Sequence, residues 1–331
     1  MNRVGQQQLA DRILLYLRSR PKRKVELKAL VKRFRTELAD INTSLRILHE
    51  WGYQFRQEGS KISFTSAPDI LAATEIGYKL QTKFVGKIIH SFNTVKSTND
   101  IACQLAEKGA LEGTIVTAEK QTLGRGRLGR SWHSPEKMGI YVSIILRPKF
   151  PPEKAPGLSI MTALAVAEAI DKLCAQRVQI KWPNDVLISS HKVAGVLTEL
   201  VAEKNKIGHI IIGIGINANQ QRNEFPPSIS ETATSIRNET GQEISRVSLL
   251  KDVLGNFEKL YRFYKKSQLT KLLPKIKKYS SLLGQEISVQ GNGSTISGRA
   301  VDIDKSGVLI IEWNGIRTTI ASGEVTVVKK S

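Results

Sequence analysis

Apolar side chains recur at helical spacing in three segments near the start of the chain, and two short segments of alternating apolar and polar residues follow them. Trp51-Gly52 separates the helical segments from the alternating ones. Three short helices followed by a β-ribbon predict a winged helix-turn-helix over residues 1–66, whose third helix would enter the major groove of DNA. The helical segments are residues 9–17, 27–34 and 38–48, and the alternating segments are residues 53–55 and 62–64.

The exposed face of the third predicted helix would supply the DNA contacts of such a fold. Acidic side chains at Glu37 and Asp40 lie near the start of that helix, where they would repel DNA phosphates. A winged helix that contacts protein, or one that has lost DNA binding, is therefore the alternative. The candidate DNA-binding residues on this face are Asn42, Thr43, Ser44 and Arg46.

Strands outnumber helices between residues 83 and 270, after a linker over residues 67–82 that carries one short helical pattern. Because the strands do not alternate regularly with helices, we expect a mixed α+β domain with a largely antiparallel sheet and not a Rossmann fold. The amphipathic pattern of residues 248–264 predicts a helix that continues to residue 279. The expected strands lie near residues 87–92, 113–119, 138–147, 178–182, 186–188, 193–200 and 209–216, and the other helices at residues 98–108 and 159–174.

Turn residues become closely spaced in residues 280–331, for example at Asp304-Lys305-Ser306-Gly307 and at Asn314-Gly315. Five short strands separated by such turns predict a small SH3-like β-barrel. The whole chain is therefore expected to be an α+β protein with three folded parts.

The chain carries a formal net charge of +20, which favours an anionic partner. The excess is uneven: there are 14 basic and six acidic residues in residues 1–66, 22 and 17 in residues 67–250, and 14 and seven in residues 251–331. The middle of the chain is its least basic part, so we predict a nucleic-acid role for the ends and a small-molecule role for the middle.

Membrane and secretion signals are missing from the sequence. No stretch approaches the roughly 18 apolar residues of a membrane span, and the first residues lack the apolar region of a signal peptide. The two cysteines, Cys103 and Cys174, lie in apolar, helix-like patterns and are expected to be buried, unpaired thiols. These features predict a cytoplasmic protein.

Glycines and arginines alternate in the segment from Glu119 to Trp132, which is the strongest functional signal in the chain. Glycine lets the backbone approach a ligand closely, and guanidinium groups bind carboxylate or phosphate through paired hydrogen bonds. A solvated basic loop would have the same composition, so this segment alone leaves both alternatives open. Its glycines are Gly124, Gly126 and Gly129, and its arginines are Arg125, Arg127 and Arg130.

Four other short motifs in the middle of the chain place polar side chains at helix or strand boundaries. Ser97-Thr98-Asn99 would begin a helix, where hydroxyl groups usually cap backbone N–H groups but can also face a pocket. Two glycines in the apolar segment Gly213-Ile214-Gly215-Ile216-Asn217 indicate the close approach of a ligand or another backbone. The other motifs are Lys181-Trp182-Pro183-Asn184-Asp185 and Lys192-Val193-Ala194-Gly195-Val196-Leu197-Thr198-Glu199.

In this order, the Gly-Arg segment and the four motifs resemble the biotin protein ligases, and in particular the three-domain bacterial form that also represses the biotin operon. The resemblance covers nearly the whole chain. It implies a winged helix-turn-helix, a central mixed α/β catalytic domain over residues 83–270 and a C-terminal SH3-like domain. Two positions depart from the family pattern: Lys96 stands where aspartate is common, and Gly59-Ser60-Lys61-Ile62 replaces the usual wing sequence.

The resemblance also implies a two-step reaction. The carboxylate of biotin attacks the α-phosphorus of ATP to give biotinyl-5′-AMP and pyrophosphate, and a lysine of a carrier protein then displaces AMP. Lys192, Arg127 and Lys181 would be the catalytic residues, and Asp185 would help to place Mg²⁺. The biotin-binding residues would be Ser97, Thr98, Asn99, Gln121, Arg125, Gly126, Arg127, Lys192 and Gly195. The residues that bind ATP or the adenylate would be Gly124, Arg127, Arg130, Trp132, Lys181 and Asn217.

Biotin and ATP would be the substrates, and the protein partner would be the biotin carboxyl carrier protein of a biotin-dependent carboxylase. The resemblance implies a second role, in which a homodimer binds operator DNA with biotinyl-5′-AMP as corepressor. Two other classes are alternatives. A lipoate ligase shares the catalytic fold but lacks the Gly-Arg segment, and a pure nucleic-acid-binding protein would concentrate its charge in the middle of the chain.

Overall fold

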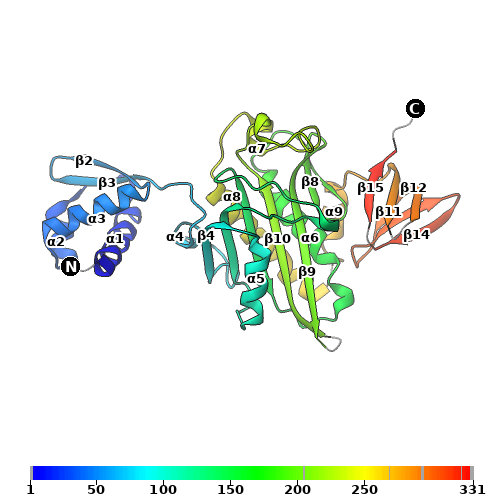
Figure 1. The fold of residues 1–331 in the computed structure, drawn as a ribbon, viewed down its shortest axis with the longest axis horizontal. Helices are drawn as coiled ribbons and strands as arrows, with labels where there is room; N and C mark the ends of the chain where they lie inside the picture. The colour runs from blue at the N-terminus through cyan, green and yellow to red at the C-terminus, as the bar shows by residue number, and fades with distance from the viewer. Residues whose placement is uncertain (1–2, 204–205, 268, 292–293, 322, 329–331) are drawn as a thin grey trace. The chain divides into compact units, whose positions relative to one another are not determined.

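The computed structural model describes residues 3–203, 206–267, 269–291, 294–321 and 323–328 (Figure 1). The chain divides into two compact units, Met1–Asp69 and Ile70–Ser331. A linker over residues 67–82 stays a prediction. Within the described part of the chain, no helix is both long and apolar enough to cross a membrane.

The first unit contains three helices and a small antiparallel sheet, which confirms the predicted fold class for this region. The apolar stripes of the three helices meet in one core, in which Ile13, Leu30 and Leu48 are completely buried. The short strand β1 (Val25–Glu26) was not predicted from the sequence, and it pairs with β3 (Lys61–Ser66). The other elements are α1 (Arg3–Arg18), α2 (Leu27–Phe34), α3 (Leu38–Glu50) and β2 (Gln54–Glu58).

Ser44 is the one candidate DNA-binding residue that the structure contradicts. Its side chain is fully buried, and Gln6 Nε2 donates a hydrogen bond to Ser44 Oγ at 2.9 Å. The reason is helical geometry, because Ser44 follows Ile41 by three residues and therefore lies on the stripe of α3 that faces the core. Asn42 and Arg46 are exposed and Thr43 is half-buried.

Seven strands form the central sheet of the second unit (Figure 1). Every neighbouring pair is antiparallel except β4 and β5, which confirms the predicted mixed and largely antiparallel sheet. In order across the sheet, the strands are β4 (Ile89–Val95), β5 (Ile115–Gln121), β6 (Gly139–Leu146), β10 (Lys206–Asn217), β9 (His191–Glu203), β8 (Asp185–Ile188) and β7 (Val178–Lys181).

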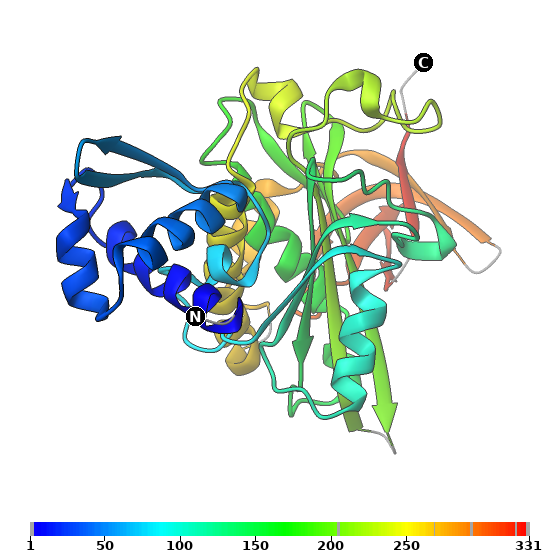
Figure 2. The ribbon, with the colours of Figure 1, turned by 60° about the vertical axis from the view of Figure 1, so that its left-hand side comes forward.

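Helices cover both faces of this sheet. On one face Ile211 packs against α5 (Thr98–Glu107), and on the other its neighbour Ile212 packs in the core with α6 (Gly157–Ile170) and α8 (Arg246–Ser267). Figure 2 shows α5 in cyan and α8 in yellow on opposite sides of the sheet. Because successive side chains of a strand point to opposite faces, strands that are covered on both sides are apolar without alternation.

Two helix predictions differ from the structure at their C-terminal ends. The helix expected at residues 159–174 ends at Ile170, and the helix expected to continue to residue 279 ends at Ser267. A separate helix, α9 (Leu273–Tyr279), follows, with Pro274 in its first turn. Proline lacks the N–H group that an uninterrupted helix would need at this position. The remaining helices are α4 (Ala73–Gly77) and α7 (Ile236–Thr240), with 3₁₀ turns at Arg127–Gly129, Pro152–Lys154 and Arg222–Glu224.

Both cysteines are free and half-buried, so the expectation of buried thiols is wrong. Cys103 lies on α5, whereas Cys174 lies beyond the end of α6 and is therefore less covered than a helical core position. Burial raises the pKa of both thiols, to about 11 for Cys174.

Five antiparallel strands form the C-terminal sheet, as the predicted fold class requires. This sheet and the central sheet share one apolar core. The Nε1–H of Trp182 donates to the carbonyl oxygen of Gly307 at 2.8 Å, and Lys277 forms an ion pair with Asp302 at 2.6 Å. In order across the sheet, the strands are β14 (Ile316–Ile320), β13 (Leu309–Trp313), β12 (Ser294–Ile303), β11 (Glu286–Gly291) and β15 (Glu324–Val327).

Candidate active site

A cavity of about 270 Å³ lies on the face of the central sheet that carries α5. The sequence motifs meet there because the start of α5, the Gly-Arg loop, the turn between β7 and β8, and the strands β9 and β10 all contribute to its wall. Of the catalytic-domain residues predicted from the sequence, those that line the cavity are Ser97, Thr98, Asn99, Gln121, Arg125, Gly126, Arg127, Arg130, Trp132, Lys181, Asp185, Lys192, Gly195 and Asn217.

Gly124 is the exception, because it does not line the cavity. Its carbonyl oxygen accepts a hydrogen bond from the backbone N–H of Trp132 at 2.8 Å, and the N–H of Gly126 donates to Arg130 at 2.7 Å. A Cβ atom at Gly124 would lie 2.5 Å from the carbonyl oxygen of Trp132. Gly124 therefore lets the two sides of the loop approach each other, and its predicted contact with the adenylate stays a prediction.

Buried polar groups form one end of the cavity. The backbone N–H and the hydroxyl of Thr98 donate to Gln121 Oε1 at 2.8 and 3.1 Å, and Gln121 Nε2 donates to Ser134 Oγ at 2.9 Å. Ser143 Oγ lies 2.8 Å from Thr98 Oγ1 and 2.5 Å from Asn99 Oδ1. This network fixes the rotamers of Thr98 and Asn99, and the N-cap residue Ser97 makes no side-chain capping bond to a described residue, so the motif does not serve mainly to cap α5.

The two glycines of β10 make room for side chains that cross the sheet. A Cβ atom at Gly213 would lie 2.4 Å from Asn99 Oδ1, and one at Gly215 would lie 2.5 Å from the indole of Trp132. The indole Nε1–H is buried and has no hydrogen-bond partner among the described residues. The close approach predicted from the glycines is thus made by Asn99 and Trp132, and an unpaired donor faces the same region.

Lys192 lies at the centre of the charged part of the cavity. Its Nζ is 2.7 Å from Asp185 Oδ1 and 5.4 Å from the centroid of the Trp132 ring, and 36% of its side chain is exposed. Its backbone N–H donates to the carbonyl oxygen of Thr232 at 2.8 Å. An ammonium group that is held by a carboxylate and an aromatic face is well oriented toward an anionic ligand.

Arg127 also points toward this region. Its guanidinium donates to Asn184 Oδ1 at 2.9 Å, and Asn184 Nδ2 in turn donates to the carbonyl oxygen of Val196 at 2.8 Å. Arg130 and Lys181 line the same cavity. Together with Lys192, these residues place a group of cations at one site, which is the arrangement needed to bind a phosphorylated ligand.

The comparisons with known proteins agree with this geometry. Residues 91–217 match the biotin/lipoate A/B protein ligase family, and residues 282–328 match the biotin protein ligase C-terminal domain. The bifunctional ligase/repressor BirA of Bacillus subtilis is 38% identical over 270 residues, which cover 81% of this chain and 82% of that protein. The chain belongs to the biotin protein ligase family.

Other members of the family extend this result. BirA of Escherichia coli is 30% identical over 290 residues, which cover 87% of this chain and 88% of that protein. A structure of biotin protein ligase from Aquifex aeolicus in complex with biotin and ATP has a TM-score of 0.64 and 32% identity. The structural match covers 74% of this chain and 100% of the Aquifex aeolicus chain. The predicted family is therefore confirmed, and the match to a biotin-specific C-terminal domain disfavours the lipoate ligase alternative.

Several cavity residues were not predicted from the sequence. Ser134 and Ser143 do not line the cavity but hydrogen-bond to Gln121 and Asn99, which do, and neither serine belongs to a predicted motif. Two further stretches contribute to the wall of the cavity from far along the chain: Ile229, Thr232 and Ala233 precede α7, and Gly323 and Val325 belong to the C-terminal sheet region. Only their position in the fold brings them to the site.

Proposed function

We propose that this biotin protein ligase uses ATP to activate biotin as biotinyl-5′-AMP and transfers the biotinyl group to a lysine of a biotin carboxyl carrier protein. The observation that carries this proposal is the position of Lys192, held by Asp185 and Trp132 in the same cavity as the polar pocket of Thr98 and Gln121. A carboxylate bound in that pocket would lie near a cluster of cations. The reaction would take place in the cytoplasm, where ATP is abundant.

The chemistry explains why cations are needed. In the first step a carboxylate oxygen of biotin forms a bond to the α-phosphorus of ATP, and the bond to the leaving pyrophosphate breaks. Two unit negative charges 4 Å apart repel each other by about 4 kcal/mol at an effective dielectric constant of ~20. Lys192, Arg127 and Lys181 would offset this repulsion as the anions approach and as charge moves to pyrophosphate. In the second step the amine of the carrier lysine forms an amide with the acyl carbon, and AMP leaves.

The polar end of the cavity would bind biotin, through Ser97, Thr98, Asn99, Gln121, Gly195 and the backbone of residues 125–127. The charged end would bind the nucleotide, through Arg127, Arg130, Trp132, Lys181 and Asn217. The buried indole N–H of Trp132, which has no partner among the described residues, supplies a free donor there. Closure of the Gly-Arg loop would keep water from the mixed anhydride.

Mg²⁺ would accompany ATP. Among the described residues there is no cluster of three or more His, Cys, Asp or Glu side chains that could hold a metal ion by itself. Asp185 is a single carboxylate and already pairs with Lys192. A site with one carboxylate suits Mg²⁺ when phosphate oxygens of the nucleotide complete the coordination, since Mg²⁺ usually binds in this way. Asp185 would therefore hold Mg²⁺ only together with the nucleotide.

Transfer of labelled biotin to a purified carrier domain tests the proposal. With ATP and Mg²⁺ present, label should appear on the normal carrier and not on a carrier whose acceptor lysine is replaced by arginine. The absence of label, and of pyrophosphate release that depends on both biotin and ATP, would contradict the proposed activity.

A second function, as a DNA-binding repressor of the biotin operon, is supported by the first unit. It carries three helices and a β-ribbon, its residues 1–66 hold 14 basic and six acidic residues, and the BirA relatives are described as bifunctional ligase/repressors. We infer that biotinyl-5′-AMP acts as corepressor and favours a homodimer that binds a palindromic operator. A gel shift with the operator of the biotin operon should appear only when biotin and ATP are both added. No shift at low salt would exclude this role.

A further inference from the structure

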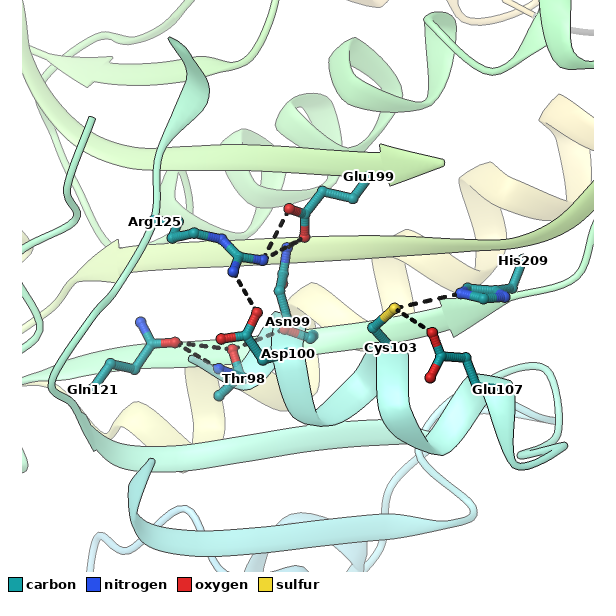
Figure 3. A network of polar contacts seen from close by, with 10 residues as sticks. Thr98, Asn99, Asp100, Cys103, Glu107, Gln121, Arg125, Glu199 and His209 are labelled. Carbon is teal, nitrogen blue, oxygen red and sulfur yellow. Dashed lines mark hydrogen bonds and ion pairs between the residues drawn. The ribbon is translucent and has the colours of Figure 1, made fainter. Parts of the chain in front are cut away.

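Arg125 differs from the other two arginines of the Gly-Arg loop in where its side chain points. Its guanidinium forms an ion pair with Asp100 in the first turn of α5, and it donates to Glu199 on β9 at 2.9 and 3.2 Å (Figure 3). Partial burial lowers the pKa of Arg125, but the two carboxylates outweigh this effect and raise it. Two acceptors from two separate elements therefore hold one side chain of the loop.

These contacts leave the backbone of the loop to face the cavity. Arg125 lies in the cavity wall together with Gly126, and the next residue, Arg127, points its side chain to Asn184 inside the cavity. Because two carboxylates already neutralise the Arg125 guanidinium, that side chain is poorly suited to bind an anionic ligand. Its position instead fixes where the backbone of residues 125–127 lies.

Glu199 connects the same cluster to the polar end of the cavity. Besides its bonds to Arg125, Glu199 Oε2 accepts a hydrogen bond from Asn99 Nδ2 at 2.6 Å. Asn99 is buried, and its Oδ1 lies 2.5 Å from Ser143 Oγ and against Gly213. The orientation of the Asn99 amide and the position of the loop thus depend on one carboxylate (Figure 3).

We propose that Asp100 and Glu199 are positioning residues that hold the Gly-Arg loop closed through Arg125. Asp100, Arg125 and Glu199 form what we call the loop anchor. The anchor presents the backbone of residues 125–127 to the ligand and slows opening of the loop. It thereby determines how long the activated intermediate stays enclosed, and this last consequence rests on the proposed ligase function.

Limited proteolysis of the full chain measures loop opening without any ligand or activity. Chymotrypsin can cleave after Leu123 and Leu128, which are 62% and 72% exposed, but cleavage requires the loop to open locally. We expect Asp100→Asn and Glu199→Gln to accelerate cleavage about two- to fivefold each, the range typical of half-exposed ion pairs. The matched control is Glu136→Gln, because Glu136 forms an exposed ion pair with Lys137 outside the anchor.

The Arg125→Gln background tests whether the carboxylates act through Arg125. It should itself accelerate cleavage, and adding Asp100→Asn to it should have no further effect, since the shared partner is already gone. Added salt should accelerate cleavage of the wild-type chain more than that of Arg125→Gln. The proposal would be overturned if both carboxylate variants were cleaved at the wild-type rate. It would also be overturned if Asp100→Asn had the same effect in the Arg125→Gln background as in the wild-type chain.

Release of preloaded biotinyl-5′-AMP tests the consequence for the intermediate. Asp100→Asn should release it about two- to fivefold faster than Glu136→Gln, with the melting temperature unchanged. Asp100 is suited to this test because its described ion pair and side-chain hydrogen bond are with Arg125, whereas Glu199 also bonds Asn99. Release at the wild-type rate from a variant whose loop is cleaved faster would overturn the link between the anchor and retention. If the wild-type chain binds no adenylate, the ligase proposal fails, and the proteolysis result still decides on the anchor.

Discussion

Several side chains in the cavity are held in one orientation by contacts with their neighbours. Lys192 is the clearest case, because Asp185 and the Trp132 ring fix its ammonium group in the charged part of the cavity. Lys137 is a useful contrast: it also has a carboxylate neighbour, Glu136, but both are exposed and lie outside the cavity. Orientation and surroundings, not residue type, separate the two lysines.

Replacement of Lys192 by alanine should abolish formation of biotinyl-5′-AMP. Loss of a fixed positive charge at the reacting anions should lower pyrophosphate release at least about 100-fold. The fold should be retained, since the Lys192 side chain is 36% exposed. The measurement is biotin-dependent pyrophosphate release alongside the melting temperature, with Lys137→Ala as control. A folded Lys192→Ala variant with near wild-type activity would refute the assigned role.

Gly215→Ala should weaken adenylate binding although it adds only one methyl group. That methyl would lie 2.5 Å from the indole of Trp132, on a central strand that cannot shift, so the indole must move. We expect the dissociation constant for biotinyl-5′-AMP to rise at least tenfold, which is a loss of about 1.4 kcal/mol of binding free energy. Gly255→Ala on α8 is the control, because a Cβ atom there meets nothing within 4 Å and alanine favours a helix. Equal affinities for the two variants would contradict the role given to Gly215.

Elements are joined at a few polar positions as well as through the apolar core. Glu258 on α8 accepts hydrogen bonds from the backbone N–H groups of Lys83, Phe84 and Val85, at distances between 2.7 and 3.0 Å. This carboxylate attaches the segment that leads into β4 to the helix layer. Although burial raises the pKa of Glu258, these three hydrogen bonds outweigh it and lower the pKa.

The contribution of Glu258 to stability should therefore depend on pH. A pKa that is lower in the folded than in the unfolded chain adds stability above the unfolded value of about 4.3, and this contribution is lost as pH falls toward the folded value. Glu258→Gln should lower the free energy of unfolding by about 1–3 kcal/mol at pH 7, and by less below about pH 4. Denaturant titrations at both pH values, with Glu136→Gln as control, measure the difference. A difference that grows as pH falls would contradict the argument.

At the scale of the whole molecule, charge and chemistry are divided between regions. The residues that line the cavity come from the second unit, whereas the excess of basic residues is largest in residues 1–66. The alternative of a nucleic-acid-binding protein that uses the Gly-Arg segment is not supported. That loop lines the cavity, and its Arg125 and Arg127 side chains contact carboxylates and an amide of the chain itself. The proposed DNA binding belongs to the first unit.

Arg46→Ala should weaken operator binding and leave biotin transfer unchanged. Arg46 is exposed on α3, and loss of one phosphate contact should reduce the slope of log K against log salt by about 1. Gel shifts at several salt concentrations, alongside the transfer assay, measure both functions. Arg222→Ala, an exposed arginine of the second unit, is the control. If both variants bind the operator equally well, Arg46 does not contact DNA.

The sequence by itself determined the order and type of most elements and the set of motifs that belong to the family. Periodicity sufficed for α3 and the apolar strands β6 and β10, because a stripe or run of apolar residues has only one way to be buried in each element. The motifs predicted much of the cavity wall, because glycines, arginines and lysines in this pattern suit the binding of anionic ligands.

Only the tertiary structure decided which partner each polar side chain has. Nothing local distinguishes Arg125, which binds Asp100 and Glu199, from Arg127, which donates to Asn184 in the cavity wall. Helical spacing places Ser44 on the core side of α3, but only the fold gives it Gln6 as a partner. Likewise, Thr232 and Val325 reach the site only because distant segments fold beside it. The reason is physical: periodicity is a property of neighbours along the chain, whereas ion pairs and cavity walls join residues that are tens to hundreds of positions apart.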